Sequence, residues 1–148
     1  MKFFFLCFVT FFILIQPALS ADFVSIKAKK AFLYEGPSSS TDKEFIITEG
    51  YPLQVMVRLK DWIKVKDHLG KISWIQSADT SKDRNVMTLN DNVNLFYKPT
   101  TESVHLAKID KDITLKLLSP FPTNGWIQVK TLSQNIEGYI RAEDVWGL

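Results

Sequence analysis

A short pattern that occurs twice in the same order constrains this chain more than any other feature. It first reads Asp61-Trp62-Ile63-Lys64-Val65-Lys66, followed by Gly70 and then Trp74-Ile75. It returns as Gly125-Trp126-Ile127-Gln128-Val129-Lys130, followed by Gly138-Tyr139-Ile140. Each copy alternates apolar and polar residues on both sides of a turn, which is typical of a β-hairpin. The repetition predicts two copies of one structural unit.

The first 20 residues have the pattern of a secretory signal peptide. Lys2 supplies a positive charge, an apolar run extends from Phe3 to Ile15, and Ala18-Leu19-Ser20 offers small residues for cleavage. A spanning helix needs about 20 apolar residues, so this run is too short for a membrane anchor. We predict cleavage after Ser20, a periplasmic or secreted protein, and no transmembrane segment in the mature chain.

Composition narrows the possible functions. The only cysteine is Cys7, inside the predicted signal peptide, so the mature chain has no thiol for a disulfide, a metal or catalysis. The formal charge of the whole chain is +2, and removal of Lys2 lowers it by one. With charges so balanced, we expect no nucleic-acid partner.

The mature chain divides into two predicted domains, residues 21–80 and 86–148, on either side of the polar stretch Ser81–Asn85. In the first, short apolar or alternating runs separated by turn residues predict five or so strands; one such run is Leu53, Val55 and Val57. No stretch shows a helical period. Because a unit of about 60 residues is too small for a sandwich, we expect an all-β fold of two small barrels that pack on each other.

With two such all-β units, the chain resembles the bacterial Src-homology-3-like (SH3b) domains. The resemblance rests on Leu33-Tyr34 with Pro37, the Trp62-Ile63 strand and Trp74-Ile75, and again on Leu95-Phe96 with Pro99, Gly125-Trp126-Ile127 and Gly138-Tyr139-Ile140. It covers nearly all of the mature chain. One departure is Ser73, which precedes Trp74 where Gly138 precedes Tyr139. The resemblance implies a non-enzymatic binding module at the cell envelope that touches cell-wall peptidoglycan, peptides or an envelope protein.

Aromatic residues are the candidate ligand-binding residues. If Ile63 and Val65 fill a barrel, Trp62 lies on the opposite face, and Trp126 does so in the second unit. There the rings can form a platform for a sugar or a peptide, or they can simply pack within and between the barrels. The resemblance adds Tyr34, Phe96 and Tyr97 at a ligand-facing loop, and Trp74 and Tyr139, directly before Ile75 and Ile140, are further candidates. The full set is Tyr34, Trp62, Trp74, Phe96, Tyr97, Trp126 and Tyr139.

No catalytic or metal-binding arrangement is predicted. His68 and His105 fall in different units without a matched acidic or thiol partner, and no phosphate-binding glycine loop is present. Lys27, Lys29 and Lys30 are interpreted as a solvated cluster. We therefore expect no cofactor and no metal. The alternatives to a wall-binding module are a structural or assembly partner that docks one envelope protein through the interdomain face, and a small hydrolase.

Overall fold

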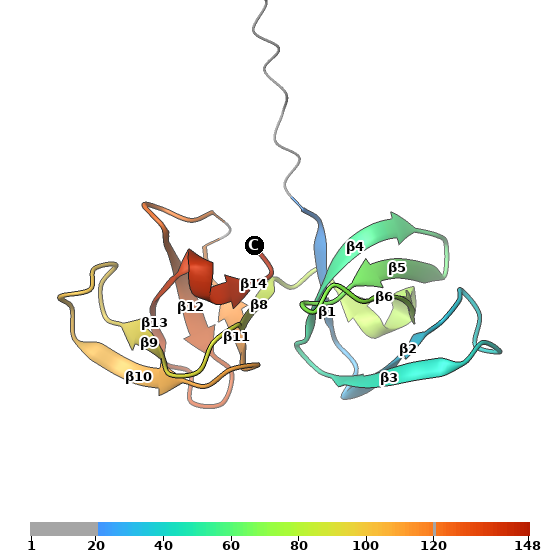
Figure 1. Ribbon diagram of the computed structural model, residues 1–148, viewed down its shortest axis with the longest axis horizontal. Coiled ribbons are helices and arrows are strands. Elements are labelled where there is room, and N and C mark those ends of the chain that lie inside the picture. The colour runs from blue at the N-terminus through green and yellow to red at the C-terminus, as the bar shows by residue number, and fades with distance from the viewer. Residues whose placement is uncertain (1–20, 120) are drawn as a thin grey trace, which may run out of the picture.

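The computed structural model describes residues 21–119 and 121–148, so the predicted signal peptide lies outside the described residues. The chain forms two curved antiparallel sheets of seven strands each, placed side by side (Figure 1). The first sheet has the order β3-β2-β6-β5-β4-β1-β7. Its strands are β1 (Phe23–Ile26), β2 (Lys30–Tyr34), β3 (Lys43–Thr48), β4 (Pro52–Arg58), β5 (Trp62–Lys66), β6 (Ile72–Gln76) and β7 (Thr80–Ser81).

The second sheet repeats this topology. Its order is β10-β9-β13-β12-β11-β8-β14, which matches the first sheet strand for strand. The strands are β8 (Asn85–Thr88), β9 (Val93–Phe96), β10 (His105–Ile109), β11 (Thr114–Leu117), β12 (Trp126–Thr131), β13 (Glu137–Arg141) and β14 (Val145–Trp146). A 3₁₀ turn precedes the last strand of each sheet, at Ser77–Asp79 and Ala142–Asp144. The predicted all-β fold with two small barrels is confirmed.

Alternation places one face of each hairpin in a core. In β5, Ile63 and Val65 are buried while Trp62, Lys64 and Lys66 are half-buried, and in β12 Ile127 and Val129 are buried. Each sheet encloses its own apolar cluster, one around Leu53 and Ile75 and the other around Leu115 and Ile140. Each barrel thus has a core of its own, as a small domain requires.

The predicted alternation along β4 is wrong at one position. Leu53 is fully buried, but the side chain of Val57 is 45% exposed. The register explains the difference, because Val55 pairs with Val65 and Val57 pairs with Lys64, so that Met56 is bulged out of the ladder. A bulge of one residue moves every later side chain to the other face of the strand.

Each sheet has two more strands than the sequence patterns predicted. The short strands β1 and β7 pair with each other through Ser25–Ser81 and Ile26–Thr80. All four residues of β1 are buried, so β1 shows no alternation to reveal it. β7 has only two residues, too few to produce a pattern.

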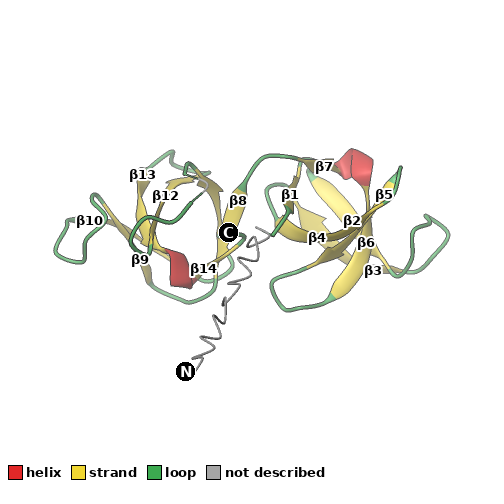
Figure 2. Cartoon of the chain, turned by 90° about the horizontal axis from the view of Figure 1, so that it is seen from above, coloured by secondary structure: helices red, strands yellow, loops and turns green. Residues whose placement is uncertain are grey.

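The two barrels meet along a seam formed by β1, β4 and the turns beside them on one side and by β8, β14 and neighbouring turns on the other (Figure 2). The ring of Phe23 packs edge-on against Trp146, with centroids 5.4 Å apart. The guanidinium of Arg84, in the connection between the barrels, lies 5.4 Å from the Phe23 ring and donates to the Gly147 carbonyl at 2.9 Å. The Asn85 side-chain amide donates to the Gly50 carbonyl at 2.9 Å. The expected packing of the two units on each other is therefore made of specific contacts.

Candidate functional site

A transverse row of four side chains crosses the outer face of each sheet. In the first unit Lys43 pairs with Tyr34, Tyr34 with Trp74, and Trp74 with Lys64. Directly opposed residues on neighbouring antiparallel strands project from the same face, so the row runs across β3, β2, β6 and β5. The equivalent row in the second unit is His105, Phe96, Tyr139 and Gln128. We call these the first row and the second row.

A β-bulge sets the composition of each row. On β3 the register moves from Leu33–Phe45 to Tyr34–Lys43, so Glu44 is skipped. Glu44 instead accepts a hydrogen bond from the Ser73 hydroxyl at 2.6 Å and pairs with Lys71 at 3.1 Å. These groups lower the pKa of Glu44, the Ser73 hydrogen bond most strongly. The second unit has the same irregularity between His105 and Ala107.

Each row rests on a tryptophan. Tyr34 packs edge-on against Trp62, with centroids 5.1 Å apart, and Phe96 packs in the same way against Trp126, at 5.3 Å. The predicted face for both tryptophans is correct, but Trp126 is only 7% exposed and Trp62 is half-buried. Tyr34 and Phe96 are buried as well. These rings therefore contribute packing, while their half-buried neighbours Trp74 and Tyr139 present the surface.

The second row borders a pocket of about 320 Å³. Gln128 and Tyr139 from the row line it together with Trp126 and with Pro99 from the loop after β9. The other lining residues are Ser119, Thr123 and Asn124. All the lining side chains are uncharged, and most offer a hydroxyl or an amide beside an aromatic edge. Such a site suits a ligand that presents hydrogen-bonding groups and an apolar surface.

Three of the lining residues come from the loop between β11 and β12, which is longer than its counterpart between β4 and β5. The loop turns at Asn124 and Gly125, both of which have positive φ, and the Thr123–Trp126 bridge closes it. The sequence shows the lengthened turn, but only the three-dimensional arrangement places it as a wall of the pocket.

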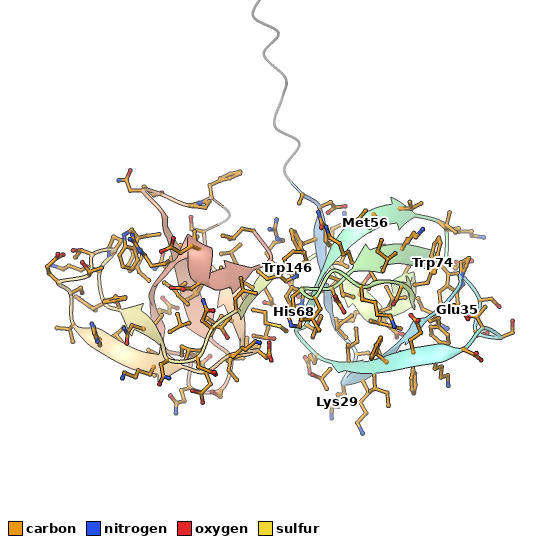
Figure 3. All side chains as sticks on the ribbon, viewed as in Figure 1. Lys29, Glu35, Met56, His68, Trp74 and Trp146 are labelled. Carbon is orange, nitrogen blue, oxygen red and sulfur yellow. The ribbon has the colours of Figure 1, made fainter. Side chains whose placement is uncertain are left out.

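Two further candidate residues, Tyr97 and Trp74, do not line the pocket. Tyr97 is 62% exposed and is not among the residues that line the pocket. Trp74 lies on the outer face of the first unit, away from the seam, whereas Trp146, which the sequence reasoning missed, lies at the seam (Figure 3). Nothing in the local pattern around Trp146 distinguishes it from an ordinary terminal residue.

The expectation that His68 has no acidic partner is wrong. Its Nε2 lies 3.4 Å from a carboxylate oxygen of Asp112 in the second unit, and its Nδ1 lies 2.7 Å from the Tyr51 hydroxyl. The two residues are far apart in the sequence and meet only because the barrels pack together. His105 contacts Phe96 edge-on, with centroids 4.7 Å apart.

Within residues 21–119 and 121–148, no group of three or more His, Cys, Asp or Glu side chains is placed to hold a metal ion. The same residues contain no helix with the length and apolar character needed to cross a bilayer.

Residues 27–82, which make up most of the first unit, match the family model of the bacterial SH3 domain. The matched segment includes all of β2 to β7 and therefore the whole first row. The second unit lies outside the matched segment but repeats the strand order of the first.

Three solved structures are similar to the chain over part of their length. NlpC2 and NlpC1 from Trichomonas vaginalis both have TM-scores of 0.40, with 10% and 11% sequence identity, and cover 87% and 90% of this chain. An NlpC/P60 family protein from Bacillus cereus has a TM-score of 0.37 and 15% identity over 84% of this chain. These matches take in 49%, 48% and 55% of the other chains, so this chain spans about half the length of the structures it matches. No curated protein matches the sequence.

Proposed function

We propose that the protein is a non-enzymatic, exported binding module that recognises a cell-wall component through the pocket beside the second row. The observation that carries the proposal is the uncharged, aromatic-edged pocket of about 320 Å³ on the second barrel, which repeats the strand order of the unit that matches the bacterial SH3 domain. Its amide and hydroxyl groups match the amides and hydroxyls of wall peptide and glycan. The match of the first unit to the bacterial SH3 domain supports a binding role.

The proposal assigns different roles to the candidate aromatic residues. Tyr139 and Gln128 are half-buried and line the pocket, so they would touch a ligand directly. Trp126 and Phe96 hold the pocket floor in place, as their T-shaped contact and low exposure suggest. Trp62, Tyr34 and Trp74 form the corresponding face of the first unit.

Binding to purified cell-wall sacculi tests the proposal. Tyr139→Ala and Gln128→Ala should reduce retention on sacculi while the melting temperature stays near that of the unaltered protein. Tyr97→Ala is the matched control, because its ring is exposed but does not line the pocket. Unchanged retention in both pocket variants would refute the wall-binding proposal.

A second candidate function is docking of one envelope protein at the interdomain face. The observation in its favour is a hollow of about 480 Å³ beside the seam, with lining residues from both units such as Lys27, Glu49 and Lys116. A pull-down from envelope extract separates the two functions. Loss of a protein partner on Lys116→Ala, with sacculus retention unchanged, would favour docking.

Export is part of the proposal and concerns residues outside the described ones. We expect the protein from the periplasmic or secreted fraction to begin at Ala21. N-terminal sequencing that found Met1-Lys2 on membrane-bound material would contradict it.

A further inference from the structure

We infer that the first row, Lys43–Tyr34–Trp74–Lys64, is a second binding site that takes a short acidic peptide in an extended conformation. This site lies on the other barrel from the neutral pocket and does not depend on it. The inference rests on the charges at both ends of the row, on what covers its rings, and on its length.

The row ends in two ammonium groups, and neither has a carboxylate partner within the described part of the chain. Nζ of Lys43 lies 4.2 Å from the centre of the Phe32 ring, and Nζ of Lys64 lies 5.8 Å from the centre of the Trp74 ring. No ion pair among the described residues involves either lysine. By contrast, Lys71, directly before β6, pairs with Glu44. A contact with a ring face positions an ammonium group but leaves N–H donors free for an anion.

The covered rings argue against a sugar as the ligand of this row. A sugar stacks on an open aromatic face, but the Lys43 ammonium covers one face of Phe32 and the Lys64 ammonium lies over the Trp74 ring, 5.8 Å from its centre. Tyr34, the ring between them, is buried. What the surface offers is two cations separated by a mostly apolar strip. A peptide with two carboxylates and an uncharged segment between them complements this arrangement.

The length of the row fixes the spacing of those carboxylates. Four neighbouring strands are separated by three spacings of about 4.8 Å, so Lys43 and Lys64 are attached about 14 Å apart. An extended chain rises about 3.3 Å per residue, which places residues i and i+4 about 13 Å apart. Glu35 and Asp42 are exposed on the loop between β2 and β3, next to Tyr34 and Lys43. A longer acidic run would meet repulsion there, so the site favours two carboxylates over many.

The second unit provides a natural comparison. Its row has His105 and Gln128 where the first has Lys43 and Lys64. Neither residue carries a permanent positive charge, so the second row lacks the two cations although its backbone register is the same. Exchange of these residues between the units therefore tests the charges alone.

The experiment measures binding of a labelled peptide with glutamates at positions i and i+4 by fluorescence anisotropy. Lys43→Gln and Lys64→Gln should each weaken binding by up to about fivefold at low salt. Loss of one exposed ion pair typically changes an affinity by no more than about this factor. The double variant should lose most of the salt dependence as well. Lys29→Gln removes the same charge on the far side of the first unit from Trp74 and should leave binding unchanged (Figure 3).

A gain of binding provides a stricter test. In the background of Lys43→Gln and Lys64→Gln, the changes His105→Lys and Gln128→Lys should restore binding of the same peptide on the second row. Peptides with glutamates at i and i+2, and peptides made entirely of glutamate, should bind less tightly than the i, i+4 peptide.

Three outcomes would overturn the inference. If Lys29→Gln weakened peptide binding as much as the row variants do, the peptide would be attracted by the net charge of the protein alone. Binding of inorganic polyphosphate as tight as that of the peptide, with no effect of glutamate spacing, would show an unspecific anion surface. Unchanged binding in the double variant would show that the row is not the site. Gln128→Ala distinguishes this inference from the proposed function, since it should impair sacculus retention but not peptide binding.

Discussion

His68 of the first barrel and Asp112 of the second are joined across the seam, with 3.4 Å between Nε2 and the nearer carboxylate oxygen. The other imidazole nitrogen, Nδ1, is 2.7 Å from the hydroxyl of Tyr51. A neutral imidazole that accepts the Tyr51 proton donor at Nδ1 would direct its Nε2–H toward Asp112. Asp112, in a turn of the second unit, thus contacts the hydrogen-bonded pair of Tyr51 and His68 in the first unit. Its carboxylate lies beside His68, and its negative charge also acts on the Tyr51 hydroxyl.

Tyr51 gives this contact a measurable pH dependence. Burial, together with the negative charges of Asp67 and Asp112, raises the pKa of Tyr51 from 10.0 to about 12. Because the folded state prefers the protonated phenol, this contribution to stability is complete below pH 10 and is lost as the pH rises toward 12. Tyrosinate absorbance during an alkaline titration should therefore show a late step, from the Tyr51 phenol, that coincides with unfolding.

Two variants identify that phenol. Tyr51→Phe should remove the late step from the titration. Asp112→Asn should move it only part of the way back toward 10.0, because burial is the larger cause of the shift. A late step that persists in Tyr51→Phe would assign it to another tyrosine and contradict the prediction.

Asn85 should couple the stability of the two barrels. Its amide donates to the Gly50 carbonyl in a buried position, so Asn85→Ala leaves that carbonyl without its partner at a cost of about 1–3 kcal/mol. Differential scanning calorimetry should show one cooperative transition for the unaltered protein and a lower, broader or divided one for Asn85→Ala. Asn90→Ala is the control, because Asn90 is exposed and bonds only within the second unit. Similar curves for the two variants would show that the seam does not couple the units.

The repeated hairpin could be predicted from the sequence because its information is local. Ile63 and Val65 alternate with polar residues inside one strand, and the burial of β5 follows that alternation. The bulges could not be predicted in this way. One skipped residue places Lys43 rather than Glu44 opposite Tyr34, and no pattern along β3 indicates where the skip occurs.

The seam and the pocket depend on contacts between distant segments. Phe23, Arg84 and Trp146 lie in the first strand, the connection and the last strand, and each looks unremarkable in its own neighbourhood. Trp126 and Tyr139, which the sequence offered as ligand-binding candidates, both line the pocket. The sequence could not tell that Trp126 is buried and Tyr139 only half-buried, because that difference depends on how the surrounding segments pack.

The two repeat tryptophans should differ in their contribution to stability. Trp126 is 7% exposed, so Trp126→Ala should cost about 3–5 kcal/mol in the free energy of unfolding. Trp62 is half-buried, and Trp62→Ala should cost less. Tyr97→Ala should stay within about 0.5 kcal/mol of the unaltered protein, because its ring is mostly exposed. Urea unfolding of the three variants checks the order, and a larger cost at Trp62 than at Trp126 would contradict it.

Gly138 and Ser73 occupy equivalent places before the aromatic residue of each row, but only one of them has room for a side chain. A Cβ added at Gly138 would lie 2.7 Å from the Phe96 carbonyl oxygen and 2.8 Å from Cγ of Leu95. Because the first of these atoms is backbone, Gly138→Ala should shift β9 away from β13 and cost about 1–3 kcal/mol or more. Ser73→Ala keeps its Cβ and should lose only the hydrogen bond to Glu44.

The two substitutions also differ in what they do beyond stability. Gly138→Ala should weaken retention on sacculi, because it changes the spacing between β9 and β13, and β13 carries Tyr139 of the pocket. Ser73→Ala should raise the pKa of Glu44 toward its ordinary value of 4.5, since the Ser73 hydroxyl is the largest cause of its lowering. The stability that Glu44 contributes is present above that value and lost as the pH falls, so Ser73→Ala should flatten the acid limb of the stability profile. Acid unfolding of both variants measures this, and a flattened limb in Gly138→Ala but not in Ser73→Ala would refute the assignment.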